Sequence, residues 1–458
     1  MRLEPKVGTP EGPFQPKRGY ENDLEEGGDV DASALPAGNG APDRGTPGAS
    51  RDVSCTGLRW PGRTQRGSTV LLGADAVSET PAAEAAAAAV QYLKPRAQSF
   101  ADCTVEDSGL KDYLLHAQRM QHVLLLVGSG ASLSAGGPSM WDLWTAIVGD
   151  PPEGSGAAVL DLVGYAGEAN PNIEELLSRC DAWLQINENH PKYSSVISFR
   201  LAAITKILEL CKLAGQDHTQ LGPHEDLLRK LCRRRSRDHR LRIFTTNYDL
   251  CLEHAASNLG ITLLDGFSFS WPRRFDPRFL EMDIVERQAD QSEPGPFVSG
   301  AALYMKLHGS VNWSSDEKHR TTIIDAPTAE SACIVYPART KYQKSYTTPY
   351  FDLMSRFLAA LRQPNTCLIT IGFGFNDDHF THPIEQAVKT NPHFRLVAVA
   401  PGAADAPNAW ERFRTYAKAG RDVMLVKATL QTFVEQLPAF TALSPAEQLL
   451  ETVKRVTK

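Results

Sequence analysis

Short, uninterrupted apolar segments alternate along this chain with segments of helical spacing, and this alternation restricts the folds that the chain can adopt. In His122–Val127, five apolar residues follow one another, which suits a strand that is buried on both faces, as in a parallel sheet. Further strands are predicted at residues 241–246, 303–307, 333–336, 367–371, 396–400 and 423–426. Helices are predicted at 173–186, 202–213, 250–259 and 350–361, among others. The alternation predicts an α/β fold with a Rossmann-like, doubly wound parallel sheet.

The N-terminal part of the chain differs from the rest in composition. Residues 1–77 are rich in Gly, Pro, Asp, Glu and Ser, and they cannot bury enough apolar surface to offset the entropy of ordering. We predict a largely disordered extension over residues 1–100, with one alanine-rich helix that starts at Ala82, continues through Leu93 and ends at Pro95. The folded domain is predicted at 101–440, with a helical insertion at about 151–240, and a C-terminal helix is predicted at 441–458.

Charge and hydropathy exclude several classes of protein. The 458-residue chain has a formal net charge of −6, which gives no general attraction to nucleic acid or to an anionic membrane. No apolar run approaches the ~20 residues that span a bilayer, and residues 1–18 lack the apolar core of a signal peptide. We therefore expect a cytoplasmic protein. The basic run at 233–242 could contact nucleic acid or an acidic partner, but a solvated helix end explains it more simply.

The eight cysteines are scattered along the chain, and no two of them form a C-x-x-C pair. A zinc ribbon needs such pairs, so we predict no zinc site and expect the cysteines to be small buried residues. His379 and His382 lie near Asp377 and Asp378, but their spacing matches no strong metal site.

A glycine-rich loop follows the first predicted strand and precedes a helix-like stretch at 140–148. It reads Val127-Gly-Ser-Gly-Ala-Ser-Leu-Ser-Ala-Gly-Gly-Pro138. Its first two glycines let the backbone approach a pyrophosphate, which the loop N–H groups and serine hydroxyls could hold. Because Leu133 occupies the third glycine position of the dinucleotide fingerprint, a tight strand-to-helix turn explains the loop equally well. The candidate binding residues are Gly128, Ser129, Gly130, Ala131 and Ser132.

Polar residues follow two further predicted strands. Thr245-Thr-Asn-Tyr-Asp249 ends one of them, which places Asn247 and Asp249 where ligands bind in open α/β sheets. Taken alone, either residue is more simply a helix cap. His308 follows another strand and precedes Gly309; a neutral imidazole is the natural base near neutral pH, and this histidine is distinguished by its position.

A fourth strand end carries Gly-Phe-Gly-Phe-Asn-Asp. Gly372 and Gly374 would allow close approach of the backbone to a nucleotide, and Asn376 or Asp377 could contact a ribose hydroxyl. A turn with a helix cap at either polar residue is the simpler alternative. Each of the four motifs is weak alone, but four strand ends of this kind describe one crevice along one edge of the sheet.

In their order, these motifs resemble those of the sirtuin family. Sirtuins carry G-A-G-x-S, T-Q-N-x-D and His-Gly, where this chain has Gly128-Ser-Gly-Ala-Ser132, Thr245-Thr-Asn-Tyr-Asp249 and His308-Gly309. The late Gly-Phe-Gly-Phe-Asn-Asp and the helix Asn172-Ile-Glu-Glu-Leu-Leu-Ser178 are similar to the defence-associated, bacterial NADase branch. The resemblance spans about residues 113–437.

Two departures bear on the activity. The zinc module with its two cysteine pairs is missing, and Pro138-Ser-Met-Trp141 stands where deacylating sirtuins have P-D-F-R. Similar zinc-less proteins of antiphage systems hydrolyse NAD⁺. The resemblance therefore implies an NAD⁺ glycohydrolase that releases nicotinamide and ADP-ribose, that depletes NAD⁺ in infected cells, and that acts as a homo-oligomer, with a HerA-type ATPase or another defence component as a partner.

The resemblance also implies the roles of the central residues. Asn247 would anchor the ribose or the attacking water, His308 would act as base toward a ribose hydroxyl or that water, and Asp249 would support Asn247 or the nicotinamide pocket. Two other functions stay open. An ADP-ribosyl transferase or deacylase would give a protein-linked or acyl-linked ADP-ribose product, and a regulatory module would bind NAD⁺ or ADP-ribose without turnover.

Overall fold

The structure is a computed structural model. It describes residues 90–100, 109–149, 154–168, 171–213, 221–232, 238–287, 295–318, 320–334, 348–407 and 409–439. The first 89 residues of the predicted disordered extension, the alanine-rich segment 82–89 and the C-terminal helix at 441–458 lie outside the described residues, as does the start of the basic run, 233–237.

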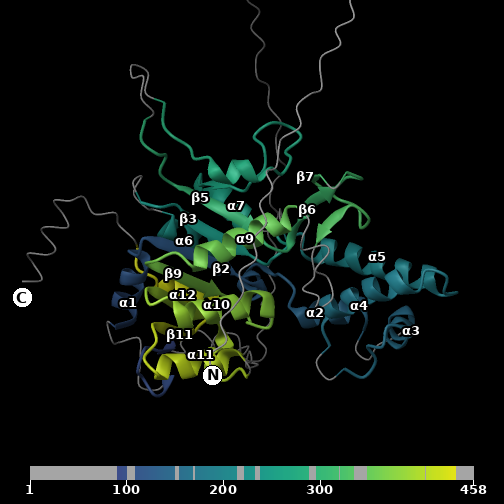
Figure 1. The fold of residues 1–458 in the computed structure, drawn as a ribbon, viewed down its shortest axis with the longest axis horizontal. Coiled ribbons are helices and arrows are strands. Elements are labelled where there is room, and N and C mark those ends of the chain that lie inside the picture. The colour runs from purple at the N-terminus through teal and green to yellow at the C-terminus, as the bar shows by residue number, and fades with distance from the viewer. Residues whose placement is uncertain are drawn as a thin grey trace, which may run out of the picture. The chain divides into compact units, whose positions relative to one another are not determined.

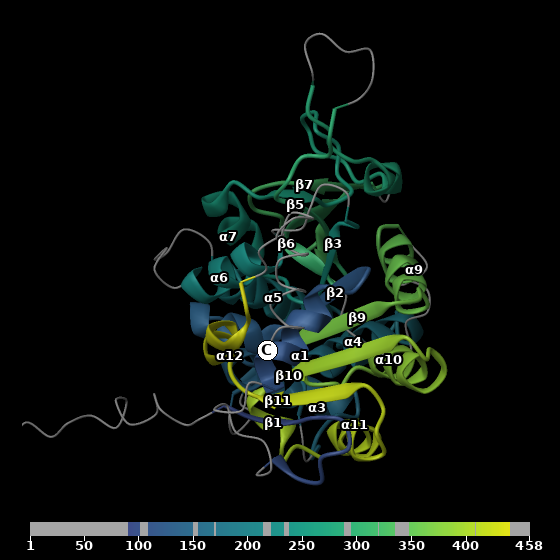
Figure 2. The same cartoon turned by 90° about the vertical axis from the view of Figure 1, so that its left-hand side faces the viewer.

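Eight strands form one sheet in the order β1-β11-β10-β9-β2-β3-β5-β4. All neighbours run parallel except β1 and β11. After β2 (His122–Val127), the chain adds β3 (Leu241–Thr245), β4 (Thr262–Leu264) and β5 (Ala301–Lys306) on one side. It then adds β9 (Thr366–Ile371), β10 (Phe394–Val399) and β11 (Val423–Lys427) on the other side, as Figure 2 shows. Strand order thus reverses between β2 and β9, which is the doubly wound, Rossmann-type arrangement and confirms the predicted fold class.

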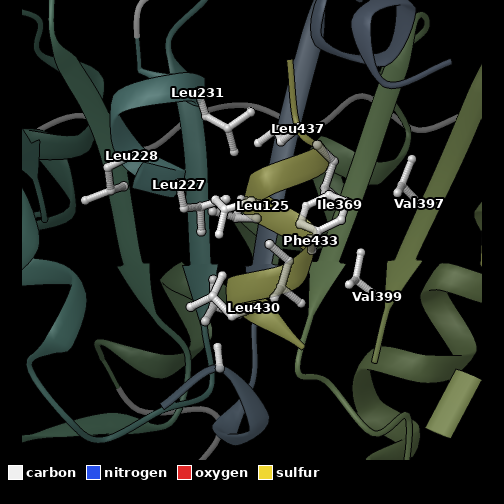
Figure 3. Packing of buried hydrophobic residues seen from close by; sticks show 14 of the residues in the cluster. Leu125, Leu227, Leu228, Leu231, Ile369, Val397, Val399, Leu430, Phe433 and Leu437 are labelled. Atoms are coloured by element: carbon white, nitrogen blue, oxygen red, sulfur yellow. The ribbon is translucent and has the colours of Figure 1, made fainter. Parts of the chain in front are cut away.

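Helices cover both faces of this sheet (Figure 1). The first face packs against α1 (Gly109–Gln118), α6 (Gly222–Leu231), α7 (Cys251–Leu259) and α12 (Leu430–Gln436). Figure 3 shows α12 there, with Phe433 between Leu125 of β2 and Ile369 of β9. The second face packs against α9 (Tyr350–Leu361), α10 (Asp378–Thr390) and α11 (Ala409–Lys418). Because β2 and β9 are buried along their whole length, their sequences are mostly apolar and do not alternate between apolar and polar residues.

Tertiary pairing explains one wrong sequence prediction and the place of one predicted strand. The segment through Tyr92 and Leu93 is a strand, β1 (Gln91–Leu93), and not the end of an alanine-rich helix, because it pairs antiparallel with β11 and buries both side chains. The strand predicted at 333–336 corresponds to β8 (Ala332–Ile334), which does not join the main sheet. It pairs antiparallel with β6 (Gly309–Ser315) in a small sheet of order β7-β6-β8, with β7 at Thr321–Ile323.

The predicted insertion is a helical module with its own core. Its helices are α3 (Gly154–Leu162), α4 (Ile173–Ile186) and α5 (Tyr193–Leu210), which begins nine residues before the predicted 202–213 helix. The helix α2 (Met140–Ile147), which precedes the predicted start of the insertion, packs in the same core. Trp144 and Tyr165 lie in this core with their rings 6.1 Å apart. The core continues into Tyr248 and into the small sheet. Helix α6, predicted within the insertion, packs on the main sheet instead.

Two features of the described residues bear on contacts with nucleic acid and with a membrane: the pairing of Arg240 and the length and apolar character of the helices. Arg240, in the described part of the basic run, donates to the carboxylate of Asp283 at 3.0 Å and so fastens a loop of its own chain. Among the described residues, no helix combines the length and the apolar character that crossing a bilayer requires.

Candidate functional site

A cavity of about 710 Å³ lies at the carboxyl ends of the central strands. One wall is formed by the loops after β2, β3, β5 and β9, and the other by helices of the module, chiefly α4. This is the place where strand order reverses, and in open α/β sheets it is where ligands bind. The volume is typical of a site for a small molecule or a nucleotide.

The loop after β2 and the loop after β9 contact each other through backbone atoms at this cavity. The N–H of Gly128 donates to the carbonyl of Ile371 at 2.9 Å, and that of Gly130 donates to the carbonyl of Gly372 at 3.0 Å. A Cβ atom on Gly372 would lie 2.2 Å from the nitrogen of Ala131, and Gly372 has a φ of +63°. Glycine is therefore required here both by space and by conformation.

This packing changes the expected role of the first glycine-rich loop. The N–H groups of Gly128 and Gly130 are engaged with the β9 loop, and that of Ala131 donates to the carbonyl of Gly128 at 3.0 Å. These three groups are thus not free to hold a pyrophosphate, contrary to the simplest interpretation of the motif. Ser129 and Ser132 line the cavity, whereas Gly130 and Ala131 do not.

A chain of buried hydrogen bonds joins this loop to the turn after β3. The hydroxyl of Ser132 donates to Oδ2 of Asp249 at 2.6 Å, and it accepts from Nδ2 of Asn247 at 2.8 Å. The same Nδ2 donates to the carbonyl of Gly128 at 3.0 Å. Because both hydrogens of the amide are used, the orientation of the Asn247 side chain is determined by its partners.

The fixed orientation leaves one acceptor of Asn247 unused. Its Oδ1 is buried and has no hydrogen-bond partner among the described residues. A buried polar atom without a partner costs free energy, about 1–3 kcal/mol. A hydroxyl or water of a bound ligand would satisfy this oxygen.

Asp249 combines the two roles that the sequence left open. One carboxylate oxygen accepts from Ser132, and the other, Oδ1, accepts the N–H of Cys251 at 3.0 Å at the start of α7. It therefore both accepts the first N–H of α7 and holds the hydrogen-bond chain of Asn247.

A buried lysine supports this turn from behind. Lys306 is 2% exposed, and its Nζ donates to the carbonyl of Asp249 and to the carboxylate of Glu253, the latter at 3.0 Å. Lys306 lies two residues before His308 on β5. It thus ties the strand of His308 to the turn that carries Asn247.

His308 lies between the main and the small sheet and faces the loop after β9. Its Nε2 is 3.4 Å from Oδ2 of Asp377, and both side chains are about nine-tenths buried. Its ring also packs against Phe380 at 5.4 Å between centroids. A carboxylate in this position favours the protonated imidazole that forms when a histidine accepts a proton.

Asp377 is held as a carboxylate by two histidines. Its Oδ1 is 3.0 Å from Nδ1 of His379 and accepts the N–H of His379 at 2.9 Å, which caps α10. Burial alone would raise the pKa of Asp377, but the contacts with His308 and His379 outweigh it and lower the pKa well below the usual range. The hydrogen bond with Asp377 raises the pKa of His379. The sequence left open whether Asp377 caps a helix or lines the site, and the structure shows that its side chain does both.

The helical module contributes a carboxylate to the cavity. Glu174 lies in the first turn of α4, where the side chain of Asn172 accepts its N–H at 2.8 Å. The hydroxyl of Tyr248 donates to Oε1 of Glu174 at 2.9 Å. Burial raises the pKa of Glu174, although attraction to His308 and the hydrogen bond from Tyr248 act in the opposite direction.

Most of the residues predicted from the sequence therefore meet in one place. Those that line the cavity are Gly128, Ser129, Ser132, Asn247, Asp249, His308, Gly372, Gly374, Asn376 and Asp377. Glu174, Tyr248, Lys306 and His379 were not predicted from the sequence as members of the site or as its support. The helix that begins at Asn172 was noted only for its resemblance, so nothing in the pattern marked Glu174.

Cysteines do not contribute reactive groups to the described part of the chain. Six of them are buried thiols, as expected: Cys180, Cys211, Cys232, Cys251, Cys333 and Cys367. Burial raises the pKa of Cys211, which lines the cavity, to about 12, so its thiol stays protonated. Within the described segments, no three or more His, Cys, Asp or Glu side chains are grouped to hold a metal ion.

Comparison with known proteins supplies a family match for part of this site. Residues 241–418 match the SIR2-like domain family. The matching segment contains Asn247, Asp249, His308 and Asp377 but not the glycine-rich loop after β2. The predicted resemblance to sirtuins is therefore confirmed for this segment, while the narrower NADase branch stays a prediction. No curated protein matches the chain in sequence.

Solved structures of Sir2 proteins are similar to this chain at low sequence identity. A Sir2 homologue in complex with NAD is 12% identical over 71% of this chain and 91% of its own, with a TM-score of 0.37. A Sir2 homologue mutant in complex with ADP-ribose is 12% identical over 71% and 94%, with a TM-score of 0.37. A structure described as the structural basis of sirtuin substrate affinity is 13% identical over 71% and 97%, with a TM-score of 0.36.

Proposed function

We propose that this protein binds NAD⁺ in the cavity and hydrolyses the bond between nicotinamide and ribose. One observation carries the proposal. The unused buried acceptor of Asn247 and the imidazole of His308, paired with Asp377, line one cavity at the point where strand order reverses. The SIR2-like match over residues 241–418 supports NAD⁺ as the ligand.

The chemistry of the reaction fits groups of this kind. When the C1′–N bond breaks, nicotinamide leaves as a neutral molecule, so no general acid is needed, and positive charge develops on the ribose. Asn247 Oδ1 accepts a hydrogen bond from a ribose hydroxyl or from the attacking water, and His308 accepts a proton from one of them. Asp377 stabilises the imidazolium that results.

The remaining cavity residues suit the rest of the dinucleotide. Ser129 and the turn with Gly374 and Asn376 line the cavity next to the packed glycine loops. We assign the pyrophosphate to Ser129 and the backbone around Gly374, and a ribose hydroxyl to Asn376. In this assignment Gly128, Gly130 and Gly372 shape the binding loops without donating to the phosphates themselves.

The test is NAD⁺ consumption with product identification by chromatography. Wild type is expected to release nicotinamide and ADP-ribose, and His308→Ala and Asn247→Ala are each expected to lower kcat by about 10²-fold or more. His393→Ala and Asn258→Ala change the same residue types at exposed positions outside the cavity and serve as matched controls. A His308→Ala variant that turns over within a few-fold of wild type would refute the assignment.

The other outcomes separate the alternative functions. A protein-linked or acyl-linked ADP-ribose would identify a transferase or a deacylase. Binding of NAD⁺ by the folded chain without turnover, alone and with its partner, would identify a regulatory module.

We extend the proposal to the biological role that the resemblance implies, which is antiphage defence by NAD⁺ depletion in a homo-oligomer, with a HerA-type ATPase or another defence component as partner. The support is the similarity of the late Gly-Phe-Gly-Phe-Asn-Asp motif and of the helix Asn172-Ile-Glu-Glu-Leu-Leu-Ser178 to the defence-associated branch. Cells that express the chain with its genomic neighbours should lose NAD⁺ upon infection, and cells with His308→Ala should not. Equal NAD⁺ levels in the two strains would refute this role.

A further inference from the structure

The helical module brings a carboxylate into the candidate site, and the arrangement around it is specific. Glu174 belongs to the first turn of α4, which forms part of the cavity wall. Its backbone is fixed by the Asn172 cap, and one of its carboxylate oxygens is fixed by the hydroxyl of Tyr248 at 2.9 Å. The side chain is therefore positioned from two sides rather than free to turn into solvent.

Tyr248 is itself rigidly held. It is 7% exposed and lies in the core of the module, while its carbonyl accepts the N–H of Val311 at 3.0 Å. It also stands between Asn247 and Asp249 in the sequence. The turn that carries Asn247 thus determines where the carboxylate of Glu174 lies.

The charged and titratable groups that face Glu174 come from every side of the cavity. His308 attracts its carboxylate and Asp377 repels it, and both are close enough to act on its pKa. Cys211, at the end of α5, is protonated and lies close enough to be affected by the charge of Glu174. On α4 itself, Arg179, which also lines the cavity, is paired with Glu175 at 3.2 Å.

The other two carboxylates at the centre of the cavity are already engaged. Both oxygens of Asp249 accept hydrogen bonds from the protein, and Asp377 is held by His308 and His379. Only Oε1 of Glu174 takes a hydrogen bond from the described residues. A general base needs a free lone pair and a pKa that is not far below the working pH. Oε2 of Glu174 takes no hydrogen bond from the described residues, and burial raises the pKa of Glu174, whereas the contacts with His308 and His379 lower that of Asp377.

We propose that Glu174 is a catalytic residue of the NAD⁺ hydrolase and removes the proton from the attacking water. This rests on the proposed function. The water oxygen forms a bond to C1′ of the ribose, while the C1′–N electron pair leaves with nicotinamide. The proton of the water passes to Oε2 of Glu174 and then to solvent. His308 is then the base for the ribose hydroxyl, and the helical module is part of the catalytic apparatus.

The experiment compares Glu174→Gln with wild type in NAD⁺ turnover from pH 5 to pH 9. The amide keeps the size and can still accept the hydrogen bond from Tyr248, but it cannot take up a proton. We expect kcat to fall by about 10²-fold or more, with ADP-ribose affinity within about three-fold of wild type. Glu209→Gln, an exposed change on α5 outside the cavity, is the control for the module.

A pH profile separates a chemical role from a structural one. In wild type the rate should fall on the acid side as Glu174 becomes protonated, and the profile of Glu174→Gln should lack this contribution. Tyr248→Phe removes a hydrogen bond that lowers the pKa of Glu174, so it should move the acid limb to higher pH. An acid limb that stays in place in both variants would overturn the proposal.

Failure of the inference and failure of the proposed function give different results. If wild type hydrolyses NAD⁺ and Glu174→Gln does so equally well, only the role of Glu174 is overturned. If wild type binds NAD⁺ but neither the chain nor its complex turns it over, the proposed function is overturned and the role of Glu174 with it.

Discussion

Replacing Gly372 by alanine should damage both the stability and the site of this protein. Gly372 has a φ of +63°, and a Cβ atom there would lie 2.2 Å from the nitrogen of Ala131 and 2.6 Å from the carbonyl carbon of Gly130. Both neighbours are backbone atoms, which cannot turn away as a flexible side chain would. The loops after β2 and β9 would have to separate.

Two terms add up in this variant. The left-handed conformation costs a residue with a Cβ about 1–2 kcal/mol. Forcing an extra carbon into close-packed surroundings costs about 1–3 kcal/mol. We therefore expect the free energy of unfolding of Gly372→Ala to fall by about 2–5 kcal/mol.

Alanine substitutions at two other glycines separate the conformational cost from the steric cost. Gly260 has a φ of +65° with nothing within 4 Å of its Cβ position, so Gly260→Ala should show the conformational term alone, about 1–2 kcal/mol. Gly128 has a φ of −109°, but its Cβ would lie 2.6 Å from the carbonyl oxygen of Gly372. Gly128→Ala should show the steric term alone, about 1–3 kcal/mol.

The assay is urea unfolding of the three variants and wild type, together with calorimetric titration of ADP-ribose. Gly260→Ala should bind the ligand as wild type does, while Gly128→Ala and Gly372→Ala should bind it at least ten-fold more weakly. A Gly372→Ala variant that is no less stable than Gly260→Ala would refute the reasoning, because the close contact between the loops would then carry no cost.

Three further changes test the polar parts of the site. Ser132→Ala leaves the buried amide of Asn247 without one acceptor, so it should lower the free energy of unfolding by about 1–3 kcal/mol and lower kcat as well. Lys306→Met leaves the carboxylate of Glu253 without its buried cation and should cost about 3–5 kcal/mol in the same urea assay. Asp377→Asn should flatten the pH dependence of stability: the folded pKa of this carboxylate is lowered, so its contribution is present above the unfolded pKa of about 3.9 and is lost as pH falls below it.

Each of these changes has a matched control. Ser134→Ala lies on the same short helix, with a hydroxyl that donates only to a nearby carbonyl, and should cost less than Ser132→Ala. Lys427→Met breaks an exposed pair with Asp405 and should cost about 0–1 kcal/mol. Asp405→Asn should leave the acid slope of stability as in wild type; an equal change in both aspartate variants would contradict the assigned cause.

The sequence by itself determined the central architecture. Strands β2, β3, β5, β9, β10 and β11 all follow from local apolar runs, since a strand buried on both faces is apolar whatever its neighbours are. The polar ends of four of these strands could also be placed at one edge, because parallel strands share the edge where they end. Asn247, His308 and Asp377 were found in this way.

The tertiary structure alone decided which strands pair outside this centre and which polar groups remain free. Gln91–Leu93 became a strand because an open edge of β11 was available, although the sequence before it favours a helix. The N–H groups of Gly128 and Gly130 are engaged by a loop that is more than 200 residues away in the chain. The spacing of apolar residues along a segment indicates whether that segment is buried. It does not indicate which distant segment will pack or pair with it.

The same limit applies to the chemistry of the site. Ser132 and Asp249 are 117 residues apart, and Glu174 and Tyr248 are 74 residues apart. Nothing in the α4 segment marks Glu174, because its helical pattern would be the same if the residue faced water. Its raised pKa and its contact with the turn of Asn247 arise only when the helical module closes over the end of the sheet.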